Sequence, residues 1–288
     1  MEIDKVLRNV PDYKVFFTVD EFNKNSEELV EEFPGEASFV SLGRSGKGEE
    51  ISALKIGEGS FNAVLVGGIH PFEPVGSLMQ DYLSRTLLEN PEYLKDLDVS
   101  WTLIKCIDPD RMKMNEGWFK EPRTPLNFVK NLYRPALRHQ VSCNFPIEYK
   151  TWIWNNILPE TQCLMDYIDA YETNLMFELH NSWLSGTWYR ITKDCPPLYP
   201  VFRELSVKEK IPLNARNGSM ISKPTSLYSS IEEMYERIFK NVNDSRIQMH
   251  GVSPVYYTME RWNSLDCYVK YPTSSTQELR MKAYRAPQ

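Results

Sequence analysis

The sequence lacks the features that would place it in or across a membrane. Its 288 residues contain no apolar run that approaches the roughly 18 residues of a membrane-spanning helix. Its first residues, MEIDKVLRNV, carry acidic side chains and lack the positively charged stretch and apolar segment of a secretory signal. We therefore expect a cytoplasmic protein that does not interact with a membrane.

Basic residues and paired cysteines are also scarce. Lys and Arg number 33 against 39 Asp and Glu, which gives a net charge of -6 and argues against nucleic acid as a partner. The odd set of scattered cysteines contains no C-x-x-C pair: Cys106, Cys143, Cys163, Cys195 and Cys267. This pattern indicates reduced thiols rather than disulfides or a thiolate zinc site, so a metal would need histidine and carboxylate ligands.

No internal repeat, low-complexity tract or long Gly/Ser linker divides the chain. We therefore predict one domain over residues 1–288, with residues 1–37 as an N-terminal helical segment packed on it. Within that segment, Thr18 and Glu21 have the spacing of a capping box, and a helix is expected to end before the sequence FPGE.

Helix-like and strand-like segments alternate along the rest of the chain. Residues 50–57 alternate like a half-buried strand, and residues 62–68 form a short apolar run like a strand covered on both faces. Further strands are predicted at 99–107 and 174–179, and helices at 74–88, 161–171 and 196–210. The alternation predicts an α/β sandwich with a mostly parallel sheet, in which ligands bind beyond the carboxyl ends of the strands.

Two histidines follow such strands. His70 and Glu73 lie in GGIHPFEP directly after the strand at 62–68, and His180 lies in FELHNSW after the strand at 174–179. Two imidazoles and one carboxylate form the His₂Glu set that leaves zinc a fourth position for water, as catalytic zinc requires. The alternative interpretation makes His180 a core histidine held by Glu178 or Asn181, and His70 an ordinary residue of a strand-end turn.

A further carboxylate, Glu278, lies in the strand-like segment SSTQELRMK. It could act as general base towards a zinc-activated water and then as acid towards the leaving group. The alternative is an exposed carboxylate paired with Arg280.

Taken in order, these motifs resemble the zinc carboxypeptidase superfamily, peptidase family M14, of which carboxypeptidase A is the best-known type. H-x-x-E, a strand-end histidine and E-L-R follow one another as in that family, and SLGRSGKGEEISALKIG and IDPDRMKMN resemble further family segments. The resemblance runs from about residue 38 to residue 281. It implies a carboxypeptidase-like (phosphorylase/hydrolase-like) three-layer α/β sandwich with a mixed, mostly parallel central sheet, and one Zn²⁺ per chain.

The resemblance also assigns substrate-binding positions. Arg134 in NLYRPALR aligns with the arginine that stabilises the oxyanion, and Tyr268 is the nearest match to the tyrosine that covers the substrate, one position out of register. Ser142 and Cys143 stand where the family has the Asn-Arg pair that binds the substrate's terminal carboxylate. Neither side chain can make a bidentate charged contact with a carboxylate, and the candidates to replace that anchor are Arg123, Lys130 and Arg138.

The sequence thus predicts a zinc hydrolase that cleaves an amide bond of a peptide or a small peptide-like substrate. Two alternatives stay open: an N-acyl amino acid deacylase of the aspartoacylase-like branch, and a non-catalytic metal-binding module of the same fold. The aspartoacylase-like branch generally keeps the Asn-Arg pair that this chain lacks, whereas the presence of all the ligands together with Glu278 counts against a non-catalytic module. The sequence does not give the oligomeric state.

Overall fold

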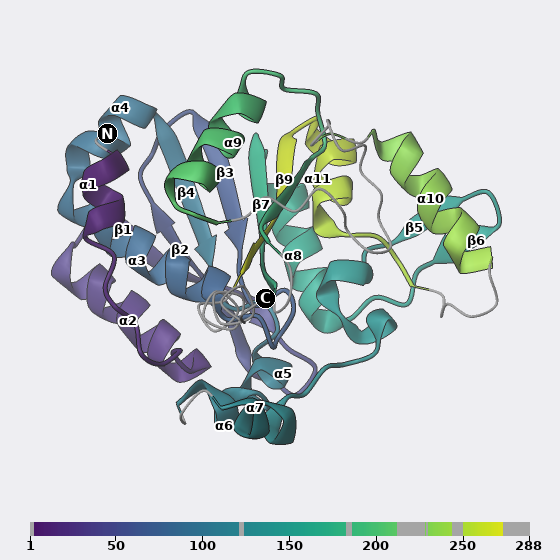
Figure 1. Cartoon of the computed structure of the whole chain (residues 1–288), viewed down its shortest axis with the longest axis horizontal. Helices are drawn as coiled ribbons and strands as arrows, with labels where there is room; N and C mark the ends of the chain where they lie inside the picture. The colour runs from purple at the N-terminus through teal and green to yellow at the C-terminus, as the bar shows by residue number, and fades with distance from the viewer. Residues whose placement is uncertain are drawn as a thin grey trace, which may run out of the picture.

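A mixed seven-stranded sheet forms the centre of the protein in a computed structural model, which describes residues 3–120, 124–182, 186–211, 228, 230–243 and 250–272 (Figure 1). The strands lie in the order β1-β2-β4-β3-β7-β9-β8. Their bounds are β1 Ala37–Arg44, β2 Glu50–Ile56, β3 Phe61–Val66, β4 Val99–Ile104, β7 Leu175–Ser182, β8 Trp188–Ile191 and β9 Leu265–Pro272. The four central strands β4, β3, β7 and β9 are parallel, and the strands on both sides of them pair antiparallel. A separate two-stranded sheet contains β5 Ile147–Tyr149 and β6 Trp152–Trp154.

Helices cover both faces of the large sheet and make the three layers of the sandwich (Figure 1). On one side lie α2 and α3, and on the other lie α8 and α11. The helices are α1 Ile3–Arg8, α2 Val19–Glu32, α3 Val75–Glu89, α4 Pro91–Leu97, α5 Pro109–Lys113, α6 Glu116–Phe119, α7 Pro125–Asn131, α8 Pro159–Ala170, α9 Leu198–Lys208, α10 Ile231–Asn243 and α11 Pro254–Trp262. Two 3₁₀ turns, η1 Leu137–His139 and η2 Val141–Cys143, precede β5. The predicted fold class is therefore confirmed.

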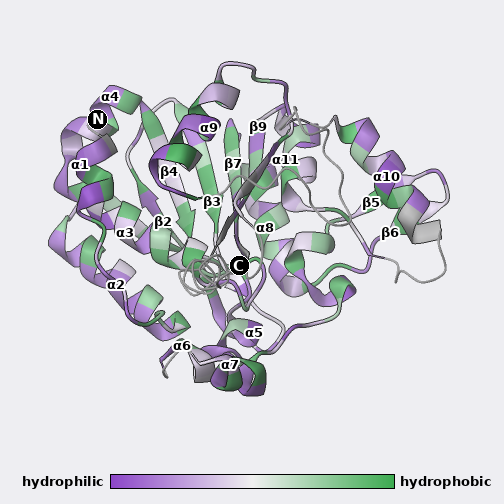
Figure 2. Cartoon of the chain, viewed as in Figure 1, coloured by the Kyte–Doolittle hydropathy of each residue, from purple (hydrophilic) through white to green (hydrophobic). Residues whose placement is uncertain are grey.

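The sheet is buried because its strands are apolar on both faces. In β3, Val64 and Val66 join the core beneath α8 and α11, whereas Leu65 joins the core beneath α2 and α3. Figure 2 shows these central strands coloured mainly as hydrophobic, as expected for strands that are buried on both faces. The interpretation of residues 50–57 as a half-buried strand is wrong, because β2 lies between the two helical layers and most of its residues are buried on both faces.

The capping box at the start of α2 is confirmed. The Thr18 side chain accepts the backbone N–H of Glu21, and the Glu21 carboxylate accepts the backbone N–H of Thr18. Both contacts satisfy donors that a helix N-terminus leaves unpaired. The helix ends at Glu32, directly before the FPGE segment.

Close packing of α3 against β7 holds the loop after β3 next to the end of β7. A Cβ atom on Gly76 would lie 2.4 Å from the Cβ of Leu179, so only glycine allows this approach at the first turn of α3. Because α3 begins just after Glu73 and Leu179 precedes His180, this contact fixes the loop at 67–74 relative to the end of β7.

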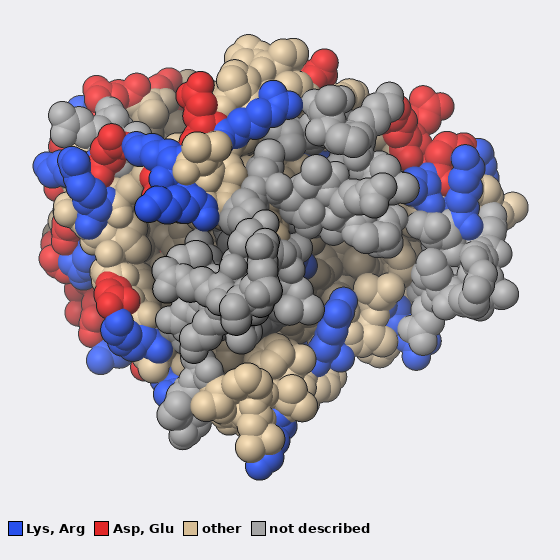
Figure 3. All heavy atoms as spheres, viewed as in Figure 1, with Lys and Arg blue, Asp and Glu red and all other residues tan. Residues whose placement is uncertain are grey.

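None of the helices in the described ranges is long and apolar enough to cross a membrane. On the face shown in Figure 3, the described Lys and Arg side chains are interspersed with Asp and Glu side chains, without one broad region of a single sign.

Buried Asp266 ties β9 to both neighbouring strands. Its carboxylate accepts the backbone N–H of Met176 at 2.9 Å and the hydroxyl of Ser264 at 2.6 Å, and its backbone exchanges hydrogen bonds with Thr192. Burial raises the pKa of Asp266 from 3.8 to about 8. The protonated carboxyl group is therefore favoured in the folded protein.

This raised pKa predicts that the protein loses stability as pH rises from about 4 to about 8. Between the unfolded and folded pKa values the folded chain binds more protons, so the free energy of unfolding falls by up to about 1.4 kcal/mol per pH unit. Asp266→Asn should flatten this fall in urea unfolding measured at pH 5, 6, 7 and 8, whereas Asp12→Asn, at an exposed site, should not. Parallel pH profiles for wild type and Asp266→Asn would contradict the assignment.

Candidate metal centre

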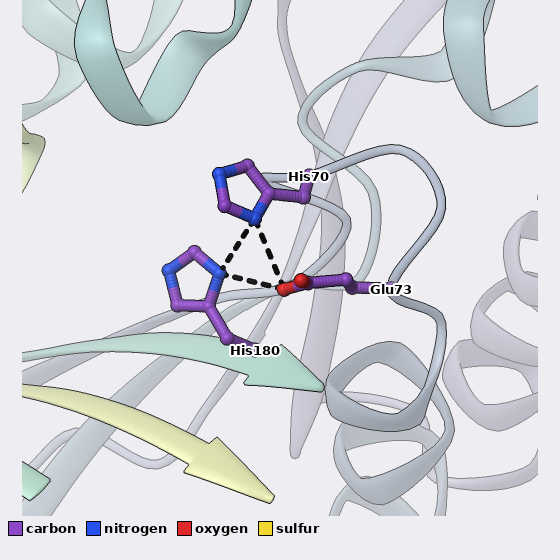
Figure 4. A group of neighbouring side chains, drawn as sticks. All are labelled: His70, Glu73 and His180. Atoms are coloured by element: carbon purple, nitrogen blue, oxygen red, sulfur yellow. Dashed lines mark hydrogen bonds and ion pairs between the residues drawn. The ribbon is translucent and has the colours of Figure 1, made fainter. Parts of the chain in front are cut away.

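Two strand ends bring the candidate ligands together at the carboxyl edge of the parallel strands. His70 and Glu73 lie in the loop between β3 and α3, where the backbone N–H of Glu73 donates to the carbonyl of His70 at 2.9 Å. His180 lies near the end of β7, which pairs directly with β3. The three side chains point towards one another in Figure 4, although 110 residues separate the two histidines.

Three atoms form the centre of this group. Nδ1 of His70 lies 3.1 Å from Nδ1 of His180, and Oε2 of Glu73 lies 3.1 Å from the first nitrogen and 2.8 Å from the second. All three residues are at least nine-tenths buried. In the described part of the chain, this is the one group of His, Cys, Asp and Glu side chains whose geometry could hold a metal ion.

The hydrogen bonds on the far sides of the rings allow Nδ1 of both histidines to face the centre with a lone pair. Nε2 of His180 lies 3.1 Å from Oε2 of Glu178, and an ionised carboxylate can only accept, so Nε2 carries the proton. In neutral His180, Nδ1 then presents a lone pair to Glu73. Nε2 of His70 lies 2.8 Å from the hydroxyl of Ser142, so its Nδ1 is likewise available to face the centre unprotonated.

The pKa values favour a neutral imidazole on His70 and an ionised carboxylate on Glu73. Burial lowers the pKa of His70 to about 4, against the opposing charge of Glu73, so its imidazole is neutral at pH 7. Burial alone would raise the pKa of Glu73, but His70 and His180 hold it well below its usual range. Neutral imidazoles and an ionised carboxylate are the forms that bind a metal.

The donor set fits a divalent cation such as zinc. Acceptor atoms that face one another at 2.8–3.1 Å repel unless a proton or a cation lies among them. Ligands about 2.0–2.1 Å from tetrahedral zinc lie about 3.3 Å apart, close to this spacing. Glu178 is itself held by the hydroxyl of Ser253 and the backbone N–H of Val255, so the partner of His180 is fixed in place.

Comparison of the sequence with known protein families identifies the family to which this chain belongs. A sequence profile described as zinc carboxypeptidase matches residues 23–285. The chain belongs to the zinc carboxypeptidase family. No curated protein matches the sequence.

Solved structures share the carboxypeptidase fold at low sequence identity. A metallo-carboxypeptidase from Burkholderia cenocepacia is 15% identical with a TM-score of 0.54, over 89% of this chain and 60% of that one. Carboxypeptidase A from Helicoverpa armigera is 16% identical with a TM-score of 0.56, over 89% and 64%. Bovine thrombin-activatable fibrinolysis inhibitor, solved with tick carboxypeptidase inhibitor, is 12% identical with a TM-score of 0.55, over 91% and 87%. The chain thus spans less than two thirds of the first two structures.

Arg134, the predicted oxyanion-stabilising residue, lies on the rim of the centre. Its exposed guanidinium carbon lies 5.3 Å from the ring centroid of Phe72, and that ring stacks on His70 with centroids 5.4 Å apart and planes 7° apart. Arg134 is thus linked to His70 through Phe72, and its role in stabilising an oxyanion stays a prediction.

Ser142 and Cys143, which the sequence resemblance aligns with the family's Asn-Arg pair, lie in η2, and Ser142 lies beside His70. Ser142 contacts Nε2 of that histidine, so the structure places it against a candidate ligand. Burial raises the pKa of the Cys143 thiol to about 11, which keeps it protonated at neutral pH. Of the candidates to replace the carboxylate anchor, Lys130 and Arg138 are exposed, and Arg123 lies outside the described residues.

Tyr268 lies within β9, opposite Glu178, and its ring stacks on His180 with centroids 3.9 Å apart. Burial, followed by the charges of Glu73 and Glu178, raises the pKa of Tyr268 well above its usual range. A role in covering the substrate stays a prediction. Glu278, the predicted general base, lies outside the described residues.

The sequence reasoning missed one charged group at the centre, Lys270. Its ammonium lies 3.1 Å from Oε1 of Glu73, and β9 places it directly opposite His180 on β7. A weak signal was present, because a lysine between Val269 and Tyr271 interrupts a run of apolar and aromatic residues. Only the pairing of β9 with β7 shows that this lysine faces the histidines.

The hydrogen bond from His180 to Glu178 predicts a test of the centre. Glu178→Gln keeps an acceptor oxygen but removes the charge that orients and polarises the imidazole, so affinity for Zn²⁺ should fall by about 10- to 100-fold. Zinc dissociation constants can be measured by competition with a chromophoric chelator. Glu160→Gln is the matched control, because Glu160 is another buried glutamate and its carboxylate accepts the backbone N–H of Gly46. Equal affinity of Glu178→Gln and wild type would show that this hydrogen bond does not support metal binding.

Proposed function

We propose that this protein is a zinc-dependent hydrolase that cleaves an amide bond of a peptide or a small peptide-like substrate. The observation that carries the proposal is the buried convergence of two imidazole nitrogens and one carboxylate oxygen, with a hydrogen-bond partner behind each ring that allows its proton to lie away from the centre. Membership of the zinc carboxypeptidase family supports zinc as the ion and an amide as the bond.

His70, Glu73 and His180 would hold one zinc ion per chain. When bound, zinc would supply the Lewis acidity that lowers the pKa of water and polarises a carbonyl group. Glu278 is proposed to take a proton from the attacking water and deliver it to the leaving nitrogen. Arg134 is proposed to stabilise the oxyanion, and its position on the Phe72 ring next to His70 supports this role.

The surroundings of His70 bear on the substrate class. Ser142 is engaged with His70, and Cys143 is neutral, so neither position offers a cation for a terminal carboxylate. We therefore propose a peptide-like amide that is not selected through a charged anchor at these two positions.

Zinc content is the first expected outcome. Protein purified without added metal should carry about one zinc per chain by elemental mass spectrometry, and His180→Ala should lose it because a ligand is removed. His139→Ala, at an exposed histidine of η1, should retain it. A wild-type protein that binds no zinc even when zinc is offered would refute the metal site.

Hydrolysis is the second expected outcome. Glu278→Gln should lower turnover by about 100-fold or more while zinc content stays unchanged, since general acid–base catalysis contributes at least that factor. Exposed Glu58→Gln, between β2 and β3, should be as active as wild type.

The substrate panel should contain blocked peptides, free peptides and N-acyl amino acids. Faster cleavage of peptides than of N-acyl amino acids is expected. The reverse order would identify a deacylase, and a zinc-loaded wild type that hydrolyses no amide or ester would identify a binding module.

A further inference from the structure

A lysine ammonium lies against the carboxylate of the candidate metal centre. Nζ of Lys270 is 3.1 Å from Oε1 of Glu73, and the side chain of Lys270 is 22% exposed while that of Glu73 is 2% exposed. Lys270 is fixed by the parallel pairing of β9 with β7, in which it lies opposite His180. The contact therefore joins a position on β9 to the loop between β3 and α3.

The two oxygens of Glu73 have separate partners. Oε2 faces Nδ1 of both histidines and accepts the backbone N–H of Asn181 at 3.0 Å. Oε1 accepts from Lys270. While this ion pair persists, Oε1 is held towards Lys270 and Oε2 towards the two histidines, and this orientation favours ligation through Oε2 alone.

The charge of Lys270 acts in opposite directions in the two states of the centre. Without metal, the ammonium compensates a buried carboxylate that would otherwise be expensive to keep ionised. With a divalent ion beside Oε2, the same ammonium is a like charge a few ångströms from the metal and weakens its binding. One side chain thus stabilises the metal-free protein and lowers the affinity for metal.

We propose that Lys270 is a positioning residue that restricts Glu73 to one-oxygen ligation and reduces the affinity of the centre for zinc. This inference rests on the proposed metal-binding function. The proposed effect of Lys270 is on the candidate metal ligand Glu73, and it does not depend on a contact between the lysine and a substrate.

The test compares Lys270→Met, Lys270→Arg and wild type, with Lys113→Met as the control. Lys113 lies in α5 and forms its ion pairs with Asp20 and Glu49 rather than with a candidate ligand. Methionine keeps the length of the apolar stem and removes the charge, whereas arginine keeps the charge. Each protein is unfolded with urea in the presence of a chelator, and its zinc dissociation constant is measured with a competing chelator at one pH.

Opposite effects are expected from Lys270→Met. The urea midpoint of the metal-free protein should fall, because Glu73 loses its counter-ion, while zinc should bind about tenfold tighter or more, because the repulsion is gone. Lys270→Arg should restore both values towards wild type, and Lys113→Met should leave the zinc dissociation constant unchanged. X-ray absorption at the zinc edge should detect an additional oxygen neighbour in Lys270→Met, since Oε1 becomes available.

Three results would overturn the inference. Weaker zinc binding together with lower stability in Lys270→Met would give the lysine a purely structural role. Unchanged zinc affinity with a raised KM would make it a substrate-binding group only. If neither wild type nor Lys270→Met binds zinc, the proposed function fails as well, whereas zinc binding by wild type that does not tighten in Lys270→Met refutes the role of Lys270 alone.

Discussion

The mutual repulsion of three acceptor atoms is the constraint on which the rest of the site depends. Two Nδ1 atoms and one carboxylate oxygen lie 2.8–3.1 Å apart in a buried position, and in the tautomers that bind a metal neither Nδ1 carries a proton. Such an arrangement is costly in an empty protein interior and favourable around a cation. The surrounding contacts can be understood as the means of keeping these atoms in place: Ser142 behind His70, Glu178 behind His180, and Asn181 and Lys270 around Glu73.

The sheet supplies the rigidity that this repulsion demands. His180 lies on β7 and Lys270 on the adjacent parallel strand β9, so the backbone hydrogen bonds of these strands fix their spacing, while His70 lies in the loop that follows β3 on the other side of β7. Gly76 brings α3 directly onto β7 and thereby holds the Glu73 loop against the end of that strand. A site of like-charged or lone-pair-bearing groups relaxes apart if its scaffold yields, and here both scaffold elements are buried.

Much of this site could be predicted from the sequence because its signals are local. An apolar run followed by H-x-x-E, and another followed by a histidine, predict strand ends, and parallel strands place such ends at one edge. Lys270 could not be found in this way, since a lysine in a strand-like segment is normally exposed, and its contact with Glu73 spans 197 residues. The burial of β2 on both faces was missed for the same reason, because it depends on helices distant in sequence. The alternative in which Glu178 holds His180 proved compatible with a metal site, since Glu178 occupies Nε2 and leaves Nδ1 towards the centre.

The distribution of charge also distinguishes this chain from the pattern of its family. At the positions of the Asn-Arg pair it has a hydroxyl that contacts His70 and a thiol whose raised pKa keeps it neutral. Among the described side chains, the cations at the centre are instead Lys270, which pairs with a candidate ligand, and Arg134, which lies on the rim over Phe72. A cation paired with Glu73 raises the net positive charge of the ligand set without offering a bidentate surface to a substrate carboxylate. Among the described residues, the positive charge of Lys270 is therefore directed at a candidate ligand.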